Sequence, residues 1–475
     1  MSLNAERRPP ILEIADVFAD AVEPANFPKH VLRHRNTRWA QAVQFGHLSD
    51  ANWLRHFGEF APLPGNLPQP LALKYHGHQF GTYNPELGDG RGFLFAQVQD
   101  ETGRWLDLGT KGTGQTPYSR QGDGRLTLKG GVREVLAANY LEALGVNTSK
   151  AFSLIETGEQ LARNDEPSPT RSAVLVRLSH SHIRFGTFQR AAYWDDTEGM
   201  ARLVEHCVRH YYPDAADPNL GRQAAALFER IVEACARMVA QWMAAGFVHG
   251  VMNTDNFNIT GETFDFGPYR FLPISDPNFV AAYFDQTGLY RFGRQPTQAL
   301  WALQQLGGAL TLIADSDDLS GAIKAYEPAY QTSFARHALA LLGLKDGPSL
   351  QEDLEFLSTF YAWMNETGAP WSQVFFDWFG GDASEGRAKQ SRIAQLYGKG
   401  EFLPVRAGLA ARTPDRPERL DGDYFQGDRP VTLLIDEIEA LWGPIADSDT
   451  WSAYQSKLDH IEAARLALDL SNRSV

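Results

Sequence analysis

Residues 88–111 read GDGRGFLFAQVQDETGRWLDLGTK, and the order of features in this stretch decides the predicted fold. Residues 88–92 form a glycine-rich loop, where backbone N–H groups can approach phosphate oxygens without a Cβ in the way. Two runs of β-forming residues come next, and the turn at residues 100–103 between them predicts a β-hairpin that ends at Lys111. A glycine-rich loop by itself is also an ordinary turn, so a phosphate site requires further matching elements downstream.

A helix that carries a carboxylate is the next element. Apolar residues recur at helical spacing and predict an amphipathic helix over residues 131–144, with Glu134 near its start. Glycine loop, hairpin, lysine and glutamate-bearing helix stand in the order in which protein kinases hold ATP phosphates with a lysine oriented by a carboxylate. We therefore predict an ion pair between Lys111 and Glu134 beside bound phosphates.

The second half of the chain supplies candidate metal ligands. Asp265-Phe266-Gly267 matches the kinase triad whose aspartate holds Mg²⁺ against the nucleotide, and Asn256 precedes it. A carboxylate and an amide oxygen are ligands that a hard cation such as Mg²⁺ or Mn²⁺ accepts. The two motifs in this order are more specific than either alone.

The position of the kinase catalytic base is altered. Kinases place an aspartate five residues before the metal-binding asparagine, and that position here is Val251. Valine cannot accept a proton, which excludes ordinary γ-phosphoryl transfer through this position. Asp255 is the nearest replacement carboxylate, with a turn-forming aspartate as the alternative. A shifted base indicates altered chemistry without naming it.

Further basic and polar residues stand near these motifs. Arg177 and Arg184 flank a segment rich in serine and histidine, and two guanidinium groups suit phosphate oxygens, although surface ion pairs are the alternative. Asp123-Gly124 lies in a turn that can touch a nucleotide or simply reverse the chain. His76 and His78 share a strand face but lack the other ligands of a zinc site.

The composition and the pattern of apolar residues along the chain indicate the fold class. The 475 residues are 43% hydrophobic, enough for well-formed cores. Glycine and β-type alternation mark residues 60–190, and helical patterns come after them, including residues 227–246 and 299–312. We predict an α+β, protein-kinase-like bilobal fold, with a β-rich N-lobe at residues 1–190 and a helical C-lobe at residues 191–475. The polar stretch 412–429 reads as a long loop.

Charge and apolar runs limit the partners and the location. A net charge of −14 and a pI near 5.4 argue against a nucleic-acid partner held by phosphate neutralisation. Residues 1–10 carry no apolar run typical of a signal peptide, and no segment reads as a membrane span. We expect a cytoplasmic protein without a membrane partner, whose Cys207 and Cys235 are buried thiols rather than a disulfide.

Several long blocks of sequence resemble the selenoprotein O family. They read YHGHQFG at residues 75–81, LGDGR at 87–91, DLGTKGTGQTPYSR at 107–120 and Asp-Gly at 123–124, with further similarity over 291–306. The similarity is dense between residues 73 and 312. These blocks are far more specific than a three-residue kinase motif.

The resemblance implies a pseudokinase that binds ATP in a flipped orientation and transfers AMP to Ser, Thr or Tyr hydroxyls of other proteins, with release of pyrophosphate. By position in the shared motifs, it implies that Asp255 accepts the proton and that Asn256 and Asp265 hold Mg²⁺ or Mn²⁺. The nucleotide contacts that it implies are Gly88, Gly90, Arg91, Lys111, Asp123, Gly124, Arg177, Arg184 and Asp265.

Two other functions stay open at this point. A kinase that transfers the γ-phosphate fits the lysine, glutamate, asparagine and Asp-Phe-Gly motif, and Val251 argues against it. An inactive ATP-binding scaffold fits the fold, and the intact metal ligands argue against it. The region after Gly398 looks unlike the family's usual C-terminal segment, and residues 470–475 read LSNRSV rather than a cysteine- or selenocysteine-bearing tail, so redox control is in doubt.

Overall fold

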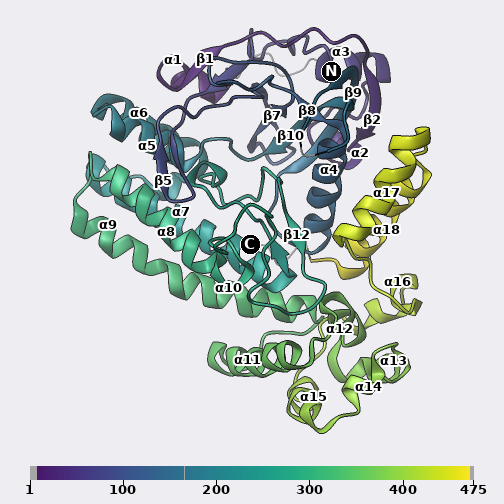
Figure 1. Cartoon of the computed structure of the whole chain (residues 1–475). Coiled ribbons are helices and arrows are strands. Elements are labelled where there is room, and N and C mark those ends of the chain that lie inside the picture. The colour runs from purple at the N-terminus through teal and green to yellow at the C-terminus, as the bar shows by residue number, and fades with distance from the viewer. Residues whose placement is uncertain (1–7, 165, 471–475) are drawn as a thin grey trace.

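The computed structural model describes residues 8–164 and 166–470 and combines an antiparallel sheet with many helices (Figure 1). Within these residues, an eight-stranded sheet has the order β1-β3-β6-β7-β10-β9-β2, with β8 paired to β10. Its strands are β1 (Ala19–Ala21), β2 (Val31–Arg35), β3 (Leu71–Leu73), β6 (Leu94–Gln99), β7 (Trp105–Lys111), β8 (Leu126–Thr127), β9 (Lys150–Leu161) and β10 (Thr170–Ser179). The α+β class is therefore confirmed.

Two small sheets and the helices complete the fold. The small sheets pair β4 (Gly77–Gln79) with β5 (Thr82–Asn84), and β11 (Phe247–Val248) with β12 (Arg270–Phe271). The helices are α1 (Ala15–Phe18), α2 (Thr37–Ala42), α3 (Asp50–Phe57), α4 (Leu128–Ala143), α5 (Phe185–Tyr193), α6 (Thr197–Tyr211), α7 (Leu220–Ala245), α8 (Gln295–Leu310), α9 (Ser316–Ala322), α10 (Tyr326–Leu341), α11 (Leu350–Thr367), α12 (Trp371–Asp377), α13 (Glu385–Gln390), α14 (Ala394–Tyr397), α15 (Leu403–Ala410), α16 (Asp423–Gln426), α17 (Ile435–Ser448) and α18 (Ser452–Leu468).

The predicted hairpin forms as β6 and β7. The two strands pair antiparallel, with Gln99 opposite Trp105 at the turn. On its other side β7 pairs with β10, which places Arg177 opposite Gly109, two residues before Lys111 at the end of β7. The sheet therefore brings the predicted lysine and one predicted arginine onto neighbouring strands.

Helix α4 lies on one face of this sheet, and α3 lies on the other (Figure 1). Helix α4 begins at Leu128, before the predicted start at residue 131, because the Thr127 hydroxyl caps it by accepting a hydrogen bond from Gly130 N at 3.1 Å. A Cβ on Gly131 would lie 2.4 Å from a Leu154 methyl group, so α4 and β9 are closely packed at this point and a larger residue would require Leu154 to move.

The helical half packs around α7. Its buried stripe ends at Gly246, where the predicted helical pattern also ends, and the φ of 66° at this glycine forms a left-handed C-cap. The predicted helix over residues 299–312 is α8, which packs beside α7 and is buried along one side (Figure 1). Cys207 in α6 and Cys235 in α7 are buried, unpaired thiols.

Some expectations need correction. Strands β1 and β2 precede residue 60, and the sequence did not predict them because short, polar-rich sheet strands have no apolar run. The stretch 412–429 is only partly a loop: it holds a 3₁₀ turn at Pro417–Asp421 and helix α16, in which Phe425 stacks on Phe379 at a centroid distance of 4.4 Å. Leu420, Tyr424 and Phe425 are the apolar residues of this polar stretch, too few and too unevenly spaced to show a helical period.

Two further observations concern the chain as a whole. Within residues 8–164 and 166–470, no helix combines the length and apolar character that a membrane span requires. Residues 1–7 and 471–475, on which the expectations about export and a C-terminal tail largely rest, lie outside the described residues. The division into lobes at residues 1–190 and 191–475 stays a prediction.

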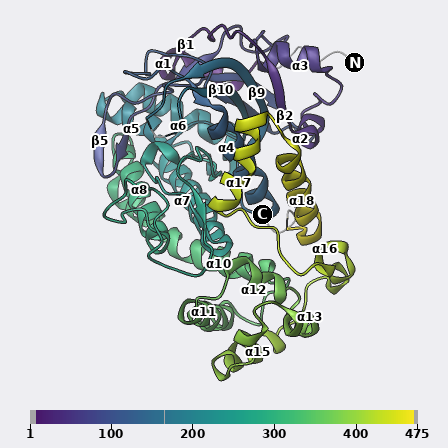
Figure 2. The same cartoon turned by 45° about the vertical axis from the view of Figure 1, so that its right-hand side comes forward.

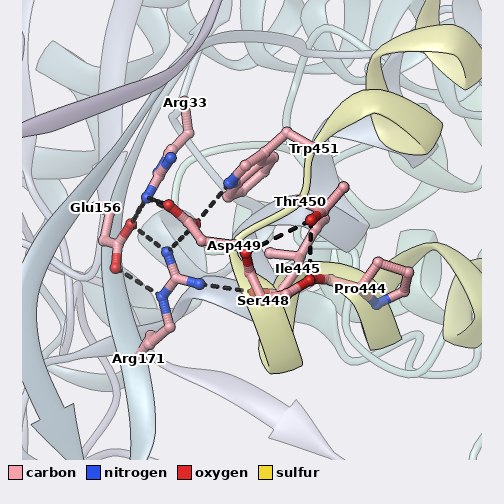
Figure 3. Close-up of polar contacts among 9 residues, drawn as sticks. All are labelled: Arg33, Glu156, Arg171, Pro444, Ile445, Ser448, Asp449, Thr450 and Trp451. Carbon is pink, nitrogen blue, oxygen red and sulfur yellow. Dashed lines mark hydrogen bonds and ion pairs between the residues drawn. The ribbon is translucent and has the colours of Figure 1, made fainter.

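Helices α17 and α18 return from the end of the chain to lie along α4 and the edge of the sheet (Figures 1 and 2). Between them, Asp449 accepts hydrogen bonds from Arg171 Nη2 at 2.7 Å, Arg33 Nη2 at 3.0 Å and Trp451 Nε1 at 2.8 Å (Figure 3). Glu156 on β9 accepts from both arginines as well. The C-terminal helices are thus tied to three strands of the sheet.

We expect Asp449→Asn to lower the free energy of unfolding by about 1 kcal/mol at neutral pH, since its side chain is 53% exposed and solvent weakens the pairing. The pKa of Asp449 is lowered from 3.8 to about 2, chiefly by the hydrogen bond from Trp451 and then by Arg171 and Arg33. Because the folded pKa is depressed, the stabilisation is complete above pH 3.8 and disappears as the pH falls towards 2.

The measurement is thermal unfolding of both proteins between pH 7 and pH 3. Asp428→Asn is the control, because Asp428 and its partner Arg429 are 88% and 68% exposed and the change should leave the melting temperature almost unaltered. A melting temperature that responds equally to both substitutions would contradict a structural role for Asp449.

Candidate active site

A cavity of ≈730 Å³ gathers almost all of the predicted site residues on its wall. Loops that come after β3, β7 and β10 line it from the sheet, and the segments around residues 251–256 and 265–268 line it from the helical half. The predicted residues on the wall are Gly88, Gly90, Arg91, Lys111, Asp123, Gly124, Arg177, Arg184, Asp255, Asn256 and Asp265. Glu134 lies behind this wall, on α4.

Lys111 and Glu134 form the predicted ion pair. Lys111 Nζ contacts Glu134 Oε1, and the two side chains are 5% and 3% exposed. Burial lowers the pKa of Lys111, and the charge of Glu134 opposes that shift. Lys111 Nζ also lies 3.7 Å from Asp265 Oδ1. The buried pair therefore connects β7 and α4 to the opposite wall of the cavity.

Asp265 is the centre of a cluster of positive charge. Arg177 Nη1 lies 2.5 Å from its Oδ1, and Arg184 Nη1 lies 2.6 Å from its Oδ2. Burial alone would raise the pKa of Asp265, but Arg177, Arg184 and Lys111 hold it well below its usual range. Among the described lining residues, seven Lys or Arg side chains stand against four Asp side chains, so positive charge is in excess on the cavity wall. Such a site favours a polyanion.

Asp265 also has a left-handed backbone, with φ of 59°. A non-glycine residue seldom adopts this conformation, and it persists where surrounding contacts enforce it. The two arginine contacts hold the side chain from β10 and from the loop after β10. The left-handed backbone and the two ion pairs thus both act to place the Asp265 carboxylate at the cavity.

Arg184 connects the glycine-rich loop to the segment that contains Asp255. Its Nη1 donates to the Asp255 carbonyl at 2.6 Å, and its Nη2 lies 3.5 Å from Asp89 Oδ1. The guanidinium lies 4.6 Å from the Tyr75 ring centroid and 4.7 Å from that of Phe264. Arg177 and Arg184 are therefore buried in a network, and the alternative of surface ion pairs is wrong.

Asp255 lies on a 3₁₀ turn, Thr254–Asn256, at the cavity. Among the described residues, its buried Oδ1 has no hydrogen-bond partner. Burial raises the pKa of Asp255 to about 6, and the positive charge of Arg184 opposes the shift. A buried carboxylate with an unused oxygen is suited to accept a proton.

The β4–β5 hairpin holds this turn in place. His78 N donates to Thr254 Oγ1 at 2.7 Å, and Phe80 N donates to Asn253 Oδ1 at 3.1 Å. A Cβ on Gly77 would lie only 3.1 Å from Asp255 Oδ1. The hairpin backbone therefore approaches the unpartnered oxygen closely and fixes its position.

His76 and His78 face separate partners rather than a common ligand. His76 Nδ1 lies 2.8 Å from the Tyr83 hydroxyl, and His78 Nδ1 lies 2.9 Å from Gln189 Nε2. The His78 imidazole thus helps to join the hairpin to α5, whereas His76 contacts Tyr83 of the hairpin itself.

Asn256 and Asp265 are suited to a hard metal ion. Asn256 Nδ2 donates to the Val251 carbonyl at 3.0 Å, which leaves Oδ1 as the available ligand atom. Asp265 contributes a carboxylate that stays ionised, and both residues line the cavity. One amide and one carboxylate oxygen leave positions for phosphate oxygens and water, as Mg²⁺ sites commonly do.

Gly88 and Gly90 of the glycine-rich loop have no room for a side chain, for a packing reason that the sequence did not reveal. A Cβ on Gly88 would lie 2.3 Å from the Tyr118 ring, and a Cβ on Gly90 would lie 2.7 Å from the Tyr118 carbonyl oxygen. The loop therefore packs against the segment after β7, whatever ligand it meets. Tyr118 donates in turn to Asp20 on β1.

Several residues on the cavity wall were not predicted from the sequence. Asp89 lies within the glycine-rich loop and faces Arg184. Arg163 lies on the wall and pairs with Asp123 at 2.8 Å, and Arg120, with φ of 52°, lies there too. Asp89 sits inside a recognised motif and could have been found, whereas Arg163 carries no local signal.

The site brings together cations suited to a polyphosphate, oxygen ligands suited to a divalent cation and a carboxylate suited to accept a proton. Comparison with known families agrees: the family model of protein adenylyltransferase SelO matches residues 1–462. The chain is 42% identical to a protein nucleotidyltransferase YdiU of Synechocystis sp., over 97% of this chain and 98% of that protein. It is 43% identical to the YdiU of Trichormus variabilis, over 98% and 96% of the two chains.

The chain therefore belongs to the protein adenylyltransferase SelO family. The match reaches residue 462, so the expectation that the region after Gly398 departs from the family is wrong. Short helices separated by polar loops, such as α13 to α16, made that region hard to recognise from its sequence.

We expect Glu134→Gln to reduce the free energy of unfolding by about 3 kcal/mol, because it leaves the Lys111 ammonium buried beside other cations without its carboxylate partner. Glu439→Gln is a matched control, since Glu439 of α17 is 47% exposed and binds Lys129 of α4 at 2.7 Å. The control should cost at most about 0.5 kcal/mol. Equal effects in chemical denaturation would contradict a special role for the buried pair.

Proposed function

We propose that this chain transfers AMP from ATP to Ser, Thr or Tyr hydroxyls of other proteins and releases pyrophosphate. One observation carries the proposal: the cavity has the lysine, arginines and metal-type ligands of a phosphotransferase, but Val251 stands where a kinase base would be, and the carboxylate of Asp255 faces the cavity instead. Membership of the protein adenylyltransferase SelO family supports the same chemistry.

The proposed architecture is kinase-like, with ATP bound between a β-rich lobe and a helical lobe. The Lys111–Glu134 pair between β7 and α4, and Asp265 on the opposite wall, support this assignment. An acidic chain with two buried, unpaired cysteines fits a cytoplasmic protein, and its net charge of −14 gives no reason to invoke a nucleic-acid partner.

The proposed nucleotide contacts use the cationic wall. Lys111, Arg177 and Arg184 would neutralise phosphate oxygens, and Arg91 and the backbone at Gly88, Gly90 and Gly124 would approach them from the loops. In a flipped orientation the α-phosphate faces Asp255, and the β- and γ-phosphates lie deeper among the cations. Asp123 would contact the nucleotide from the turn that it shares with Gly124.

The reaction then proceeds as an in-line displacement. The acceptor hydroxyl oxygen attacks the α-phosphorus, the new O–P bond forms, and the bond between the α-phosphorus and the bridging oxygen breaks. Asp255 takes the hydroxyl proton, and pyrophosphate leaves with the electron pair of the broken bond. Lys111 and the two arginines stabilise the charge on the leaving group.

Asn256 and Asp265 would hold Mg²⁺ or Mn²⁺. The cation supplies positive charge to the phosphate oxygens when it is bound. Because both carboxylate oxygens of Asp265 already contact arginines, binding of the cation would share or replace one of these contacts.

Incubation with ATP labelled at the α- or the γ-phosphate tests the proposal. With Mg²⁺ or Mn²⁺ and a cell lysate, we expect protein label only from the α-position, and none with Asp265→Ala or Lys111→Ala. Val251→Asp should not create efficient γ-phosphate transfer, because the nucleotide faces the other way. Label from the γ-position alone would restore the kinase alternative, and ATP binding without any label would favour a scaffold.

Asp255→Asn tests the assignment of the base. We expect transfer of AMP to fall by about 10²- to 10⁴-fold, as for the loss of a general base, while ATP affinity changes little. Asp285→Asn is a control, since Asp285 is also buried but accepts hydrogen bonds from backbone N–H groups of residues 289 and 290 outside the cavity. Full activity of Asp255→Asn would remove Asp255 from the mechanism.

A further inference from the structure

Three potential metal ligands meet between the N-terminal segment and α6. Glu13 ends the 3₁₀ turn Pro10–Glu13, and His206 and His210 lie on α6. Glu13 Oε2 is 3.2 Å from His206 Nδ1 and 3.0 Å from His210 Nε2. The three donor atoms all lie within 4.8 Å of one another. None of these residues belongs to the described wall of the proposed ATP cavity.

The convergence follows from the local structure. His206 and His210 are one helical turn apart, so their side chains share a face of α6, with ring centroids 4.7 Å apart. Arg202, one turn earlier, donates to the Glu13 carbonyl at 2.7 Å and binds Asp16 at 2.6 Å. The backbone that carries Glu13 is therefore fixed against the same helix face independently of the histidines.

We propose that His206 Nδ1, His210 Nε2 and Glu13 Oε2 form a binding site for a divalent transition metal, with Zn²⁺ as the best match. With metal–ligand bonds near 2.0–2.1 Å, tetrahedral ligand atoms stand about 3.3 Å apart. The separations of 3.2 and 3.0 Å from Glu13 Oε2 to the two histidine nitrogens are close to that spacing. Two imidazoles and one carboxylate form a ligand set typical of Zn²⁺, and water would complete it.

The burial of the three side chains supports the ligand roles. The His206 side chain is 1% exposed, His210 is 16% exposed and Glu13 is 39% exposed, so the site has a closed floor and an open side for entry.

Arg209 is the cation that a metal would displace. Its Nη1 lies 3.2 Å from Glu13 Oε2, but its side chain is 61% exposed and can turn into solvent. Without a metal, the two imidazoles and Arg209 share one carboxylate oxygen as hydrogen-bond donors. Metal binding replaces these contacts by coordination, at the same ligand spacing.

A metal at this site would link two parts of the fold. It ties the segment before β1 to α6, and β1 carries Asp20, which contacts Lys74 Nζ at 2.7 Å and accepts from Tyr118 at the glycine-rich loop. A metal at Glu13 therefore anchors one edge strand of the sheet to the helical half. The proposal does not depend on the transfer of AMP.

Zn²⁺ binding to the purified full chain tests the site. Competition with a chromophoric chelator should give one tight Zn²⁺ per chain, and Zn²⁺ should raise the melting temperature. Glu13→Gln and His210→Gln, both at accessible positions, should weaken binding at least tenfold and abolish the shift. Two controls should retain wild-type affinity: Asp265→Ala, which removes a ligand of the proposed active-site cation, and His460→Gln, which removes an exposed histidine on α18.

Co²⁺ substitution adds a spectroscopic check that is independent of folding stability. Visible absorption bands of tetrahedral Co²⁺ should appear with the wild-type chain and be absent with His210→Gln. The proposal is overturned if the wild-type chain binds no tight Zn²⁺, or if Glu13→Gln and His210→Gln bind it as well as the wild type. Loss of binding in Asp265→Ala alone would assign the ion to the active site and would equally overturn it.

Discussion

The contact of Asp265 with Arg177, Arg184 and Lys111 is the interaction on which the rest of the site depends. Each of the four residues comes from a different segment: the end of β7, the last part of β10, the loop after β10 and the loop before β12. A carboxylate is stable at this depth only because cations surround it, and the cations are stable there only because of the carboxylate. The cluster thus fixes the sheet relative to the loops of the helical half.

Helix α4 extends this constraint outward. Its Glu134 holds Lys111 from behind, and its other surface is covered by α18, while Tyr140 of α4 donates to the Val431 carbonyl at 2.9 Å just before α17. The end of the chain is therefore part of the support of the site, through Asp449 and the two arginines of the sheet. Segments that are far apart in the sequence all contact α4. The position of α4 in turn decides whether Glu134 reaches Lys111.

The protein's acidity and its cationic pocket are compatible because they act at different distances. A net charge of −14 is spread over the surface and is screened by salt, whereas the arginines at Asp265 are buried and act within a few ångströms. The excess of positive charge is local, which suits a small polyanion better than a long one. That distinction follows from burial, which composition alone does not contain.

The sequence by itself determined the order of chemical groups: glycine loop, hairpin, Lys111, the Glu134 helix, Asn256 and Asp265. These predictions depend on short-range patterns such as periodicity, turns and motifs, which each segment encodes locally. Apart from the Lys111–Glu134 pair, only the tertiary structure decided which groups meet. Arg163 beside Asp123, Phe425 under a polar stretch and Glu13 facing His206 are all long-range contacts, and burial and pairing across such separations depend on the packing of the whole chain.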